Sequence, residues 1–283
     1  MGQDPTAGHH ESAVIAVAPT LPEAIRVELR RLLVRPWNEL TCVVANGVIM
    51  TVLWFFAPIS IVHLVFSFHG TFVFPVVLAS WMLADVPATN ELAPDRFRAM
   101  AALDDPLVVR RLLRAKHLSL WLVVTPITVT ASVIAGFGQH DPLSTLLAVL
   151  WLLTVPFSAL GISCAVGVLW PYHPISMRQR WRWRRDRRVR WHMTWRWVIL
   201  VTTPYGLVPL FGLISFIPSR LIWFFLGNHH PDRSQLHGII LLGIAVSIPL
   251  AWVIWHLGTT RVARLAHERR AGLRAYLSNP SLG

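Results

Sequence analysis

Residues 143–169 read LSTLLAVLWLLTVPFSALGISCAVGVL, a run without a single Asp, Glu, Lys or Arg. A helix needs about 20 apolar residues to cross the hydrocarbon core of a bilayer, because the core is roughly 30 Å thick and each residue adds about 1.5 Å. The run therefore predicts a membrane-spanning helix. It favours an integral membrane protein over a soluble one.

The composition of the whole chain supports this interpretation. Of the 283 residues, 54% are hydrophobic, only 14% are charged and 14 are tryptophan. A soluble domain has about 25% charged residues, and tryptophan concentrates where a membrane meets water. Lys116 is the only lysine among 26 basic residues, a bias typical of GC-rich bacterial genomes. We therefore expect a multi-pass protein of a bacterial inner membrane, the cell membrane of the organism.

The pattern of apolar runs predicts an all-α integral membrane protein with six transmembrane helices. The predicted spans are 40–61, 63–84, 119–138, 143–169, 197–218 and 238–258. Residues 1–19 are expected to form a flexible tail, 20–260 the transmembrane domain and 261–283 a basic cytoplasmic segment.

The distribution of arginine predicts the orientation of these spans. Short loops that carry arginine and lysine stay on the cytoplasmic side. Only Arg220 and Arg233, of the 26 basic residues, lie outside four segments: the one before the first span, the loops after the second and fourth spans, and the one after the sixth. These four segments share a side if the number of spans is even. Both termini are therefore predicted to be cytoplasmic.

One of the four segments alternates arginine with tryptophan, as WRWRRDRRVRW over residues 181–191. Arginines beside a bilayer are attracted to anionic lipid headgroups by about 1 kcal/mol each. We expect anchoring to the membrane surface, with binding of a partner protein as the alternative. No nucleic-acid-binding motif accompanies the charge, so nucleic acid is not an expected partner. The expected anchoring residues are Trp181, Arg182, Trp183, Arg184, Arg185, Arg187, Arg188, Arg190 and Trp191.

Two short helices are predicted at the cytoplasmic edge. TLPEAIRVELRRLLVR begins with Thr20 and Glu23 at capping-box spacing and repeats apolar residues, including Leu32 and Leu33, on one face. It predicts an interfacial helix over 20–36 that lies along the membrane. In the loop 85–118, which mixes acids and bases, PDRFRAMAAL predicts a second helix over 94–103. This second helix is either a docking surface for a partner or a solvated loop helix.

Proline and glycine punctuate the spans. Each proline frees a backbone carbonyl and permits a kink, and glycine allows two helices to approach closely. Such helices suit a protein that rearranges. The predicted kink sites are Pro126, Pro156, Pro204, Pro209 and Pro249, and the glycines of the spans include Gly161, Gly167, Gly206 and Gly212.

The motifs of several enzyme classes are missing from the sequence. It contains no GxxxxGK[ST] loop, no HExxH and no GxSxG. We therefore expect no catalytic residues, no cofactor and no metal, and the cluster His229, His230, Asp232 and His237 is interpreted as a polar loop. No charged residue lies well inside a predicted span, which disfavours a transporter driven by an ion gradient.

Two stretches carry a family resemblance: NELAPDRFRAMAALDDPLVVRRLLRAKHLSLWLVV over 90–124, and ALGISCAVGVLWPYHP over 159–174. With the interfacial helix, six spans and cytoplasmic ends, they resemble the membrane subunit of an ABC transporter of the type-2 exporter class. The resemblance implies that a separate ATPase subunit docks on the 85–118 loop. It also implies that two permease chains, alike or different, form one pathway. The implied contact residues are Glu91, Asp95, Arg96, Arg98, Asp104 and Asp105.

Two other functions remain open at this stage. A non-transporting scaffold or assembly protein would use the arginine and tryptophan loop as its binding surface. A secondary transporter is the other alternative. If the chain does line a pathway, the lack of fixed charge in the spans favours a lipid-like or amphipathic cargo over an ion.

Overall fold

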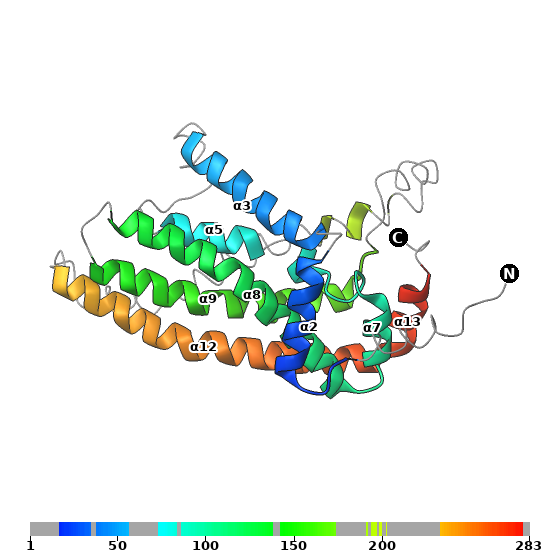
Figure 1. Cartoon of the computed structure of the whole chain (residues 1–283). Coiled ribbons are helices and arrows are strands. Elements are labelled where there is room, and N and C mark those ends of the chain that lie inside the picture. Colours follow the sequence, from blue (N-terminus) through cyan, green and yellow to red (C-terminus); the bar gives the residue numbers. More distant parts are fainter. Residues whose placement is uncertain are drawn as a thin grey trace.

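The structure is a computed structural model, and all of its described elements are helical (Figure 1). The all-α prediction is therefore confirmed for the described part of the chain. That part comprises residues 17–34, 38–56, 73–83, 86–137, 142–173, 191, 194–196, 198–199, 202 and 233–279.

Four described helices are long and apolar enough to cross a membrane, as a multi-pass membrane protein requires. They are α3 (Asn38–Phe56), α8 (Pro106–Phe137), α9 (Pro142–Leu169) and α12 (Arg233–Glu268). These helices coincide with the predicted first, third, fourth and sixth spans. Helix α5 (Val73–Leu83) is the described part of the predicted second span. The predicted fifth span, 197–218, lies almost entirely outside the described residues.

Helices α8 and α12 are longer than one crossing requires. They contain 32 and 36 residues. At about 1.5 Å per residue they measure about 48 and 54 Å, against a hydrocarbon core of roughly 30 Å. The extra length carries the charged residues at the start of α8 and the end of α12. In both helices, the apolar span therefore continues without a break into a segment that carries charged residues.

Short helices lie across the end of the bundle at which α8 begins and α12 ends (Figure 1). They are α2 (Leu21–Leu33), α7 (Arg96–Ala102) and α13 (Arg270–Ser278), and α6 (Val86–Thr89) lies between α5 and α7 in the chain. We call this end of the molecule, with the extra lengths of α8 and α12, the basic end. Helices α2 and α7 match the two predicted short helices, whereas α13 was predicted only as part of a basic segment.

The directions of α9 and α12 show which ends of the bundle the chain between these two helices must join. Helix α9 ends at the basic end, whereas α12 begins at the opposite end and packs beside α9 in the same direction (Figure 1). Residues 170–232, which join them, must therefore connect opposite ends of the bundle.

Glycine permits the close packing of α9 on α12. A Cβ atom on Gly161 would lie 2.6 Å from the Trp255 Cα atom, and one on Gly258 would overlap the Gly161 carbonyl oxygen. This confirms the predicted close approach at Gly161, because no larger residue fits without moving a backbone. The helices continue through the predicted kink sites Pro126, Pro156 and Pro249. Pro204 and Pro209 lie outside the described residues.

Two buried apolar clusters hold the described helices together. The first lies at the basic end and joins α7, α8, α12 and α13, with Leu103, Leu113 and Leu277 fully buried. The second lies inside the bundle, where Met50, Met82 and other side chains of α3, α5, α8, α9 and α12 meet. The basic end is thus a packed part of the fold and positions α7 rigidly.

Candidate functional site

A network of buried charges joins α2, the start of α7 and α8 at the basic end. The carboxylate of Glu28 lies 2.8 Å from the Arg98 guanidinium, 2.9 Å from that of Arg31 and 3.5 Å from the Lys116 ammonium. Asp95 lies 3.0 Å from Arg98 and 3.7 Å from Lys116. The network therefore ties segments together that lie some 70 to 90 residues apart in the sequence.

The position of Glu28 on α2 explains how the network forms. Ala24, Glu28 and Leu32 are spaced by four residues and make the buried face of the helix. The sequence predicted an apolar face that included Leu33, but Leu33 is 60% exposed. The Thr20 hydroxyl donates a hydrogen bond to the Glu23 carboxylate and accepts none from the backbone, so the predicted capping box does not form. Helix α2 is therefore oriented by a charged residue and not by its apolar stripe alone.

The surrounding cations keep Glu28 ionised. Burial raises the pKa of a carboxyl group, but the positive charges of Lys116, Arg31 and Arg98 outweigh it and lower the pKa of Glu28 from 4.5 to about 2. Burial also lowers the pKa of the Arg31 guanidinium, but its bonds to Glu39 and Glu28 raise the pKa further than burial lowers it. At neutral pH these pairs are fully charged.

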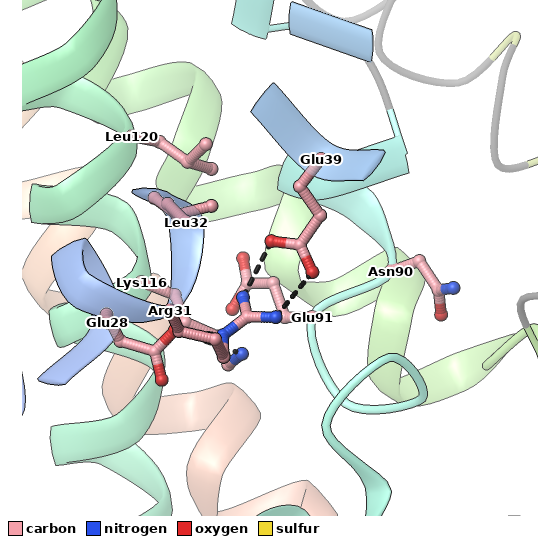
Figure 2. Close-up of a pocket in the computed structure, with 8 residues that line it drawn as sticks. All are labelled: Glu28, Arg31, Leu32, Glu39, Asn90, Glu91, Lys116 and Leu120. Atoms are coloured by element: carbon pink, nitrogen blue, oxygen red, sulfur yellow. Dashed lines mark hydrogen bonds and ion pairs between the residues drawn. The ribbon is translucent and has the colours of Figure 1, made fainter. Parts of the chain in front are cut away.

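Figure 2 shows how Arg31 bridges the network to α3. Its guanidinium makes two parallel bonds of 2.7 and 2.6 Å to the Glu39 carboxylate. A pocket of about 10 Å³ lies between these groups, which is room for roughly one water molecule. It is too small for a substrate. The pocket is lined by Glu28, Arg31, Leu32, Glu39, Asn90, Glu91, Lys116 and Leu120.

A second buried group extends the network to α12. The Nε2 atom of His117 lies 2.6 Å from Glu91, and the Trp255 indole N–H donates to His117 Nδ1 at 2.9 Å. An indole nitrogen can only donate, so Nδ1 must accept and the ring proton sits on Nε2, from which it is donated to Glu91. Trp255 therefore fixes the tautomer of His117. No pattern in the sequence predicts this contact.

The six predicted docking residues separate into two sets. Glu91 and Arg98 are only 2% and 5% exposed, and with Asp95 they belong to the buried network. Glu91 and Arg98 are too deep to contact a partner on the surface, and the partly exposed Asp95 side chain is paired with Arg98. Of the other three, Asp104 and Asp105 are exposed and Arg96 is partly exposed at the surface of the basic end.

Two apolar side chains accompany the surface set. Phe97 is 55% exposed and Leu107 is 58% exposed. The Arg96 guanidinium lies 4.7 Å from the centre of the Phe97 ring. Leu103, at the end of the same segment, is fully buried, whereas the Phe97 side chain points away from the core. We call Arg96, Phe97, Asp104, Asp105 and Leu107 the α7 surface.

Helix α13 supports the α7 surface from the side. Arg274 pairs with Asp104 at 2.6 Å and donates to the Met100 carbonyl at 3.3 Å. On α12, His267 Nδ1 lies 2.9 Å from the Leu103 carbonyl oxygen and donates to it. The amphipathic period of RAGLRAYL, residues 270–277, is the signal that could have predicted this helix.

The arginine and tryptophan loop is described only near its end. Trp191 is 71% exposed and stacks on Trp195 with ring centres 6.3 Å apart. Arg196 donates to the Pro171 carbonyl and lies over the Tyr276 ring of α13, so this end of the loop reaches the basic end. The other eight predicted anchoring residues lie outside the described part of the chain, as do His229, His230 and Asp232. Their roles stay predictions.

In comparisons with protein-family models, with curated proteins and with solved structures, the chain matches none. No group of three or more His, Cys, Asp or Glu side chains that could hold a metal occurs in the part that the structure describes. The function must therefore be argued from the α7 surface and from the network behind it.

Proposed function

We propose that the chain is the transmembrane subunit of an ATP-driven exporter of the ABC type, and that a separate ATPase subunit docks on the α7 surface. The observation that carries the proposal is the structure of α7 itself. The helix exposes one face at the end of the bundle and is fixed through its other face to α2, α8 and α13.

The composition of the α7 surface supports docking of a protein. Its two apolar side chains are more than half exposed, and they are flanked by one arginine and two aspartates. Interfaces between proteins commonly combine an apolar centre with a charged rim. Phe97 and Leu107 would form the centre, while Arg96, Asp104 and Asp105 would surround it.

The buried network gives α7 the rigid connection that coupling requires. Arg98 links α7 to Glu28 of α2, and Glu28 contacts Lys116 of α8. The neighbouring His117 joins α8 to Trp255 of α12. A displacement of α7 by ATP-driven closure of the ATPase subunits would therefore move α2, α8 and α12 together, because breaking a buried ion pair is costly.

The proposal includes six spans with both termini in the cytoplasm of a bacterium. It is supported by the connection between α9 and α12, which must run from one end of the bundle to the other and contains the apolar residues 197–218. It is also supported by the gathering of α2, α7 and α13 at the basic end (Figure 1), since each of these helices carries at least two arginines. Two such chains would form the pathway, and the cargo would be lipid-like or amphipathic.

Crosslinking tests the proposed docking directly. A photoreactive amino acid at position 97 of the tagged chain is activated in native membranes, and the captured protein is identified by mass spectrometry. We expect a protein with a GxxxxGK[ST] motif, together with ATP hydrolysis in the purified complex. The double variant Phe97→Glu and Leu107→Glu should reduce the retained ATPase at least about tenfold, because charges replace the apolar centre.

Ala275→Glu is the matched control, since it adds a charge to an exposed position of the neighbouring helix α13. It should retain the ATPase as the unaltered chain does. A captured partner without a nucleotide-binding motif would favour the scaffold alternative. Equal retention by the control and the double variant would remove α7 as the docking element.

A further inference from the structure

We propose that Arg110 and Arg114 of α8, with His256 of α12, bind the phosphate of an anionic phospholipid headgroup where the basic end meets the membrane. This site lies apart from the α7 surface. It depends on the chain spanning a membrane and not on its being a transporter.

Arg114 is held in a fixed position. Its Nε atom donates to the Thr259 hydroxyl at 3.2 Å, and Nη2 donates to His256 Nδ1 at 2.9 Å. Its guanidinium carbon lies 4.9 Å from the centre of the Trp255 ring. A guanidinium has five N–H groups, so about three remain free to bind a ligand. Little side-chain entropy would be lost on binding, because the geometry is already set.

The described part of the chain supplies no counter-charge to this site. Among the described residues, no carboxylate lies within 4.0 Å of Arg110 or Arg114, whereas Arg31 and Arg98 each pair with two. Arg110 precedes Arg114 by one helical turn, so the two cations share a face and repel each other. A bound phosphate would relieve this repulsion.

His256 adds a neutral donor. Arginine cannot accept a hydrogen bond, so His256 Nδ1 accepts from Arg114 and the ring proton must sit on Nε2. The ring stacks on Trp252 with centres 5.1 Å apart, and Trp252 is 57% exposed. The site thus presents two guanidiniums, an imidazole N–H and an exposed aromatic ring.

The position of the site along the helices favours a lipid over a soluble anion. The predicted spans begin at residue 119 of α8 and end at residue 258 of α12, so Arg114 and His256 lie near headgroup level. Trp252 lies one turn deeper, by about 6 Å. Basic pockets between transmembrane helices bind anionic headgroups, and tryptophan prefers the adjoining interface. The acyl chains would run past Trp252.

Binding of short-chain lipids tests the site in the full-length protein. The protein in maltoside detergent is titrated with dioctanoyl phosphatidylglycerol, dioctanoyl phosphatidylcholine or inorganic phosphate, and native mass spectrometry counts the bound molecules. We expect the phosphatidylglycerol to bind most tightly. Arg110→Gln should weaken it on the order of fivefold, because each arginine near a headgroup contributes about 1 kcal/mol. Arg110 makes no side-chain hydrogen bond or ion pair with the described residues, so the variant should keep its fold.

Arg264→Gln serves as the matched control, since Arg264 is an exposed arginine two turns beyond His256 on the same helix. Its effect on phosphatidylglycerol binding should stay within about twofold. Trp252→Ala should weaken phosphatidylglycerol binding without changing that of phosphate. Equal effects of the two arginine variants would show general surface attraction and overturn the site. Phosphate binding as tight as that of phosphatidylglycerol would overturn the lipid as its ligand.

Discussion

The basic end and the membrane bundle differ in the partners that most of their hydrogen-bonded polar side chains use. In the bundle, hydroxyls such as those of Thr128 and Ser247 donate to carbonyls of their own helix, three or four residues earlier. At the basic end, Glu28 and Glu91 bond to side chains of other elements. A local hydroxyl bond leaves the arrangement of the helices unspecified, whereas an ion pair between helices permits few arrangements. The basic end therefore has specific pairs in addition to its apolar cluster, whereas the bundle relies on close packing.

This difference suits the proposed roles of the two regions, the bundle as the part that spans the membrane and the basic end as the part that receives the ATPase subunit. Helices in lipid gain little from apolar contact with each other, so small residues and tight packing must hold them together. Elements at the basic end lie beside water, where an isolated buried charge would be costly and a paired one fixes the geometry. An element that receives a force from a docked subunit needs that fixed geometry, and α7 has it through Arg98.

The largest expected effect is the loss of stability of the basic end in acid. Because the pKa of Glu28 is lowered from 4.5 to about 2 in the folded protein, its charge stabilises the fold above pH 4.5, and this contribution is lost as the pH falls towards 2. Glu28→Gln mimics the protonated form. The variant should be less stable than the unaltered chain by on the order of 3 kcal/mol at pH 7, and the difference should disappear near pH 2.

Thermal unfolding in detergent, followed by tryptophan fluorescence from pH 7 to pH 2, measures this difference. Glu23→Gln is the control, because Glu23 lies on the same helix but is exposed. Its unfolding temperature should follow that of the unaltered chain at every pH. A Glu28→Gln penalty that persisted unchanged at low pH would mean that packing, and not charge, holds α2.

The stability of the bundle should depend on the volume of the side chains at its helix contacts and not on pH. Gly258→Ala places a methyl group against the Gly161 carbonyl of α9, so the two helices must separate. We expect a loss of roughly 1–3 kcal/mol, as for other overpacked interiors. Gly238→Ala lies on the same helix with no atom within 4 Å of the added carbon and should not destabilise the protein. Unfolding by SDS in mixed micelles compares the two variants, and equal losses would refute a close α9–α12 contact.

The sequence predicts the bundle better than it predicts the basic end, for a physical reason. A membrane span is a local property of about 20 apolar residues, so the predicted 143–169 agrees closely with α9, Pro142–Leu169. The charge network depends on pairs that are distant in the sequence: Glu28 meets Arg98 and Lys116 only after α2 folds onto α8. No local pattern gives such a pairing.

The predicted docking residues of α7 also show that a local pattern does not reveal which side chains will be buried by distant segments. Arg96 and Arg98 have the same chemistry and lie two residues apart, but one lies at the surface and the other is buried. Which side of α7 faces the core depends on α8 and α13, and neither contact can be inferred from PDRFRAMAAL itself. The signal that was available on α2 is the spacing of Glu28 with Ala24 and Leu32, which places this acid within an otherwise apolar face.

The smallest effect on stability is expected at the rim of the α7 surface. Asp104 and Arg274 pair at 2.6 Å, but their side chains are 66% and 42% exposed. Exposed pairs of this kind contribute about 0–1 kcal/mol, so Asp104→Asn and Arg274→Gln should each leave the unfolding temperature nearly unchanged.

The same two variants should differ in docking. Both break the pair, but only Asp104→Asn changes the charge of the α7 surface. If Asp104 contacts the ATPase subunit, Asp104→Asn should lower the amount of ATPase retained during purification, and the loss should shrink as salt screens the charge. Arg274→Gln should retain it. Should both variants lose the ATPase equally, Asp104 would act by holding α13 beside α7, and the docking contact would have to be sought on Phe97 and Leu107 alone.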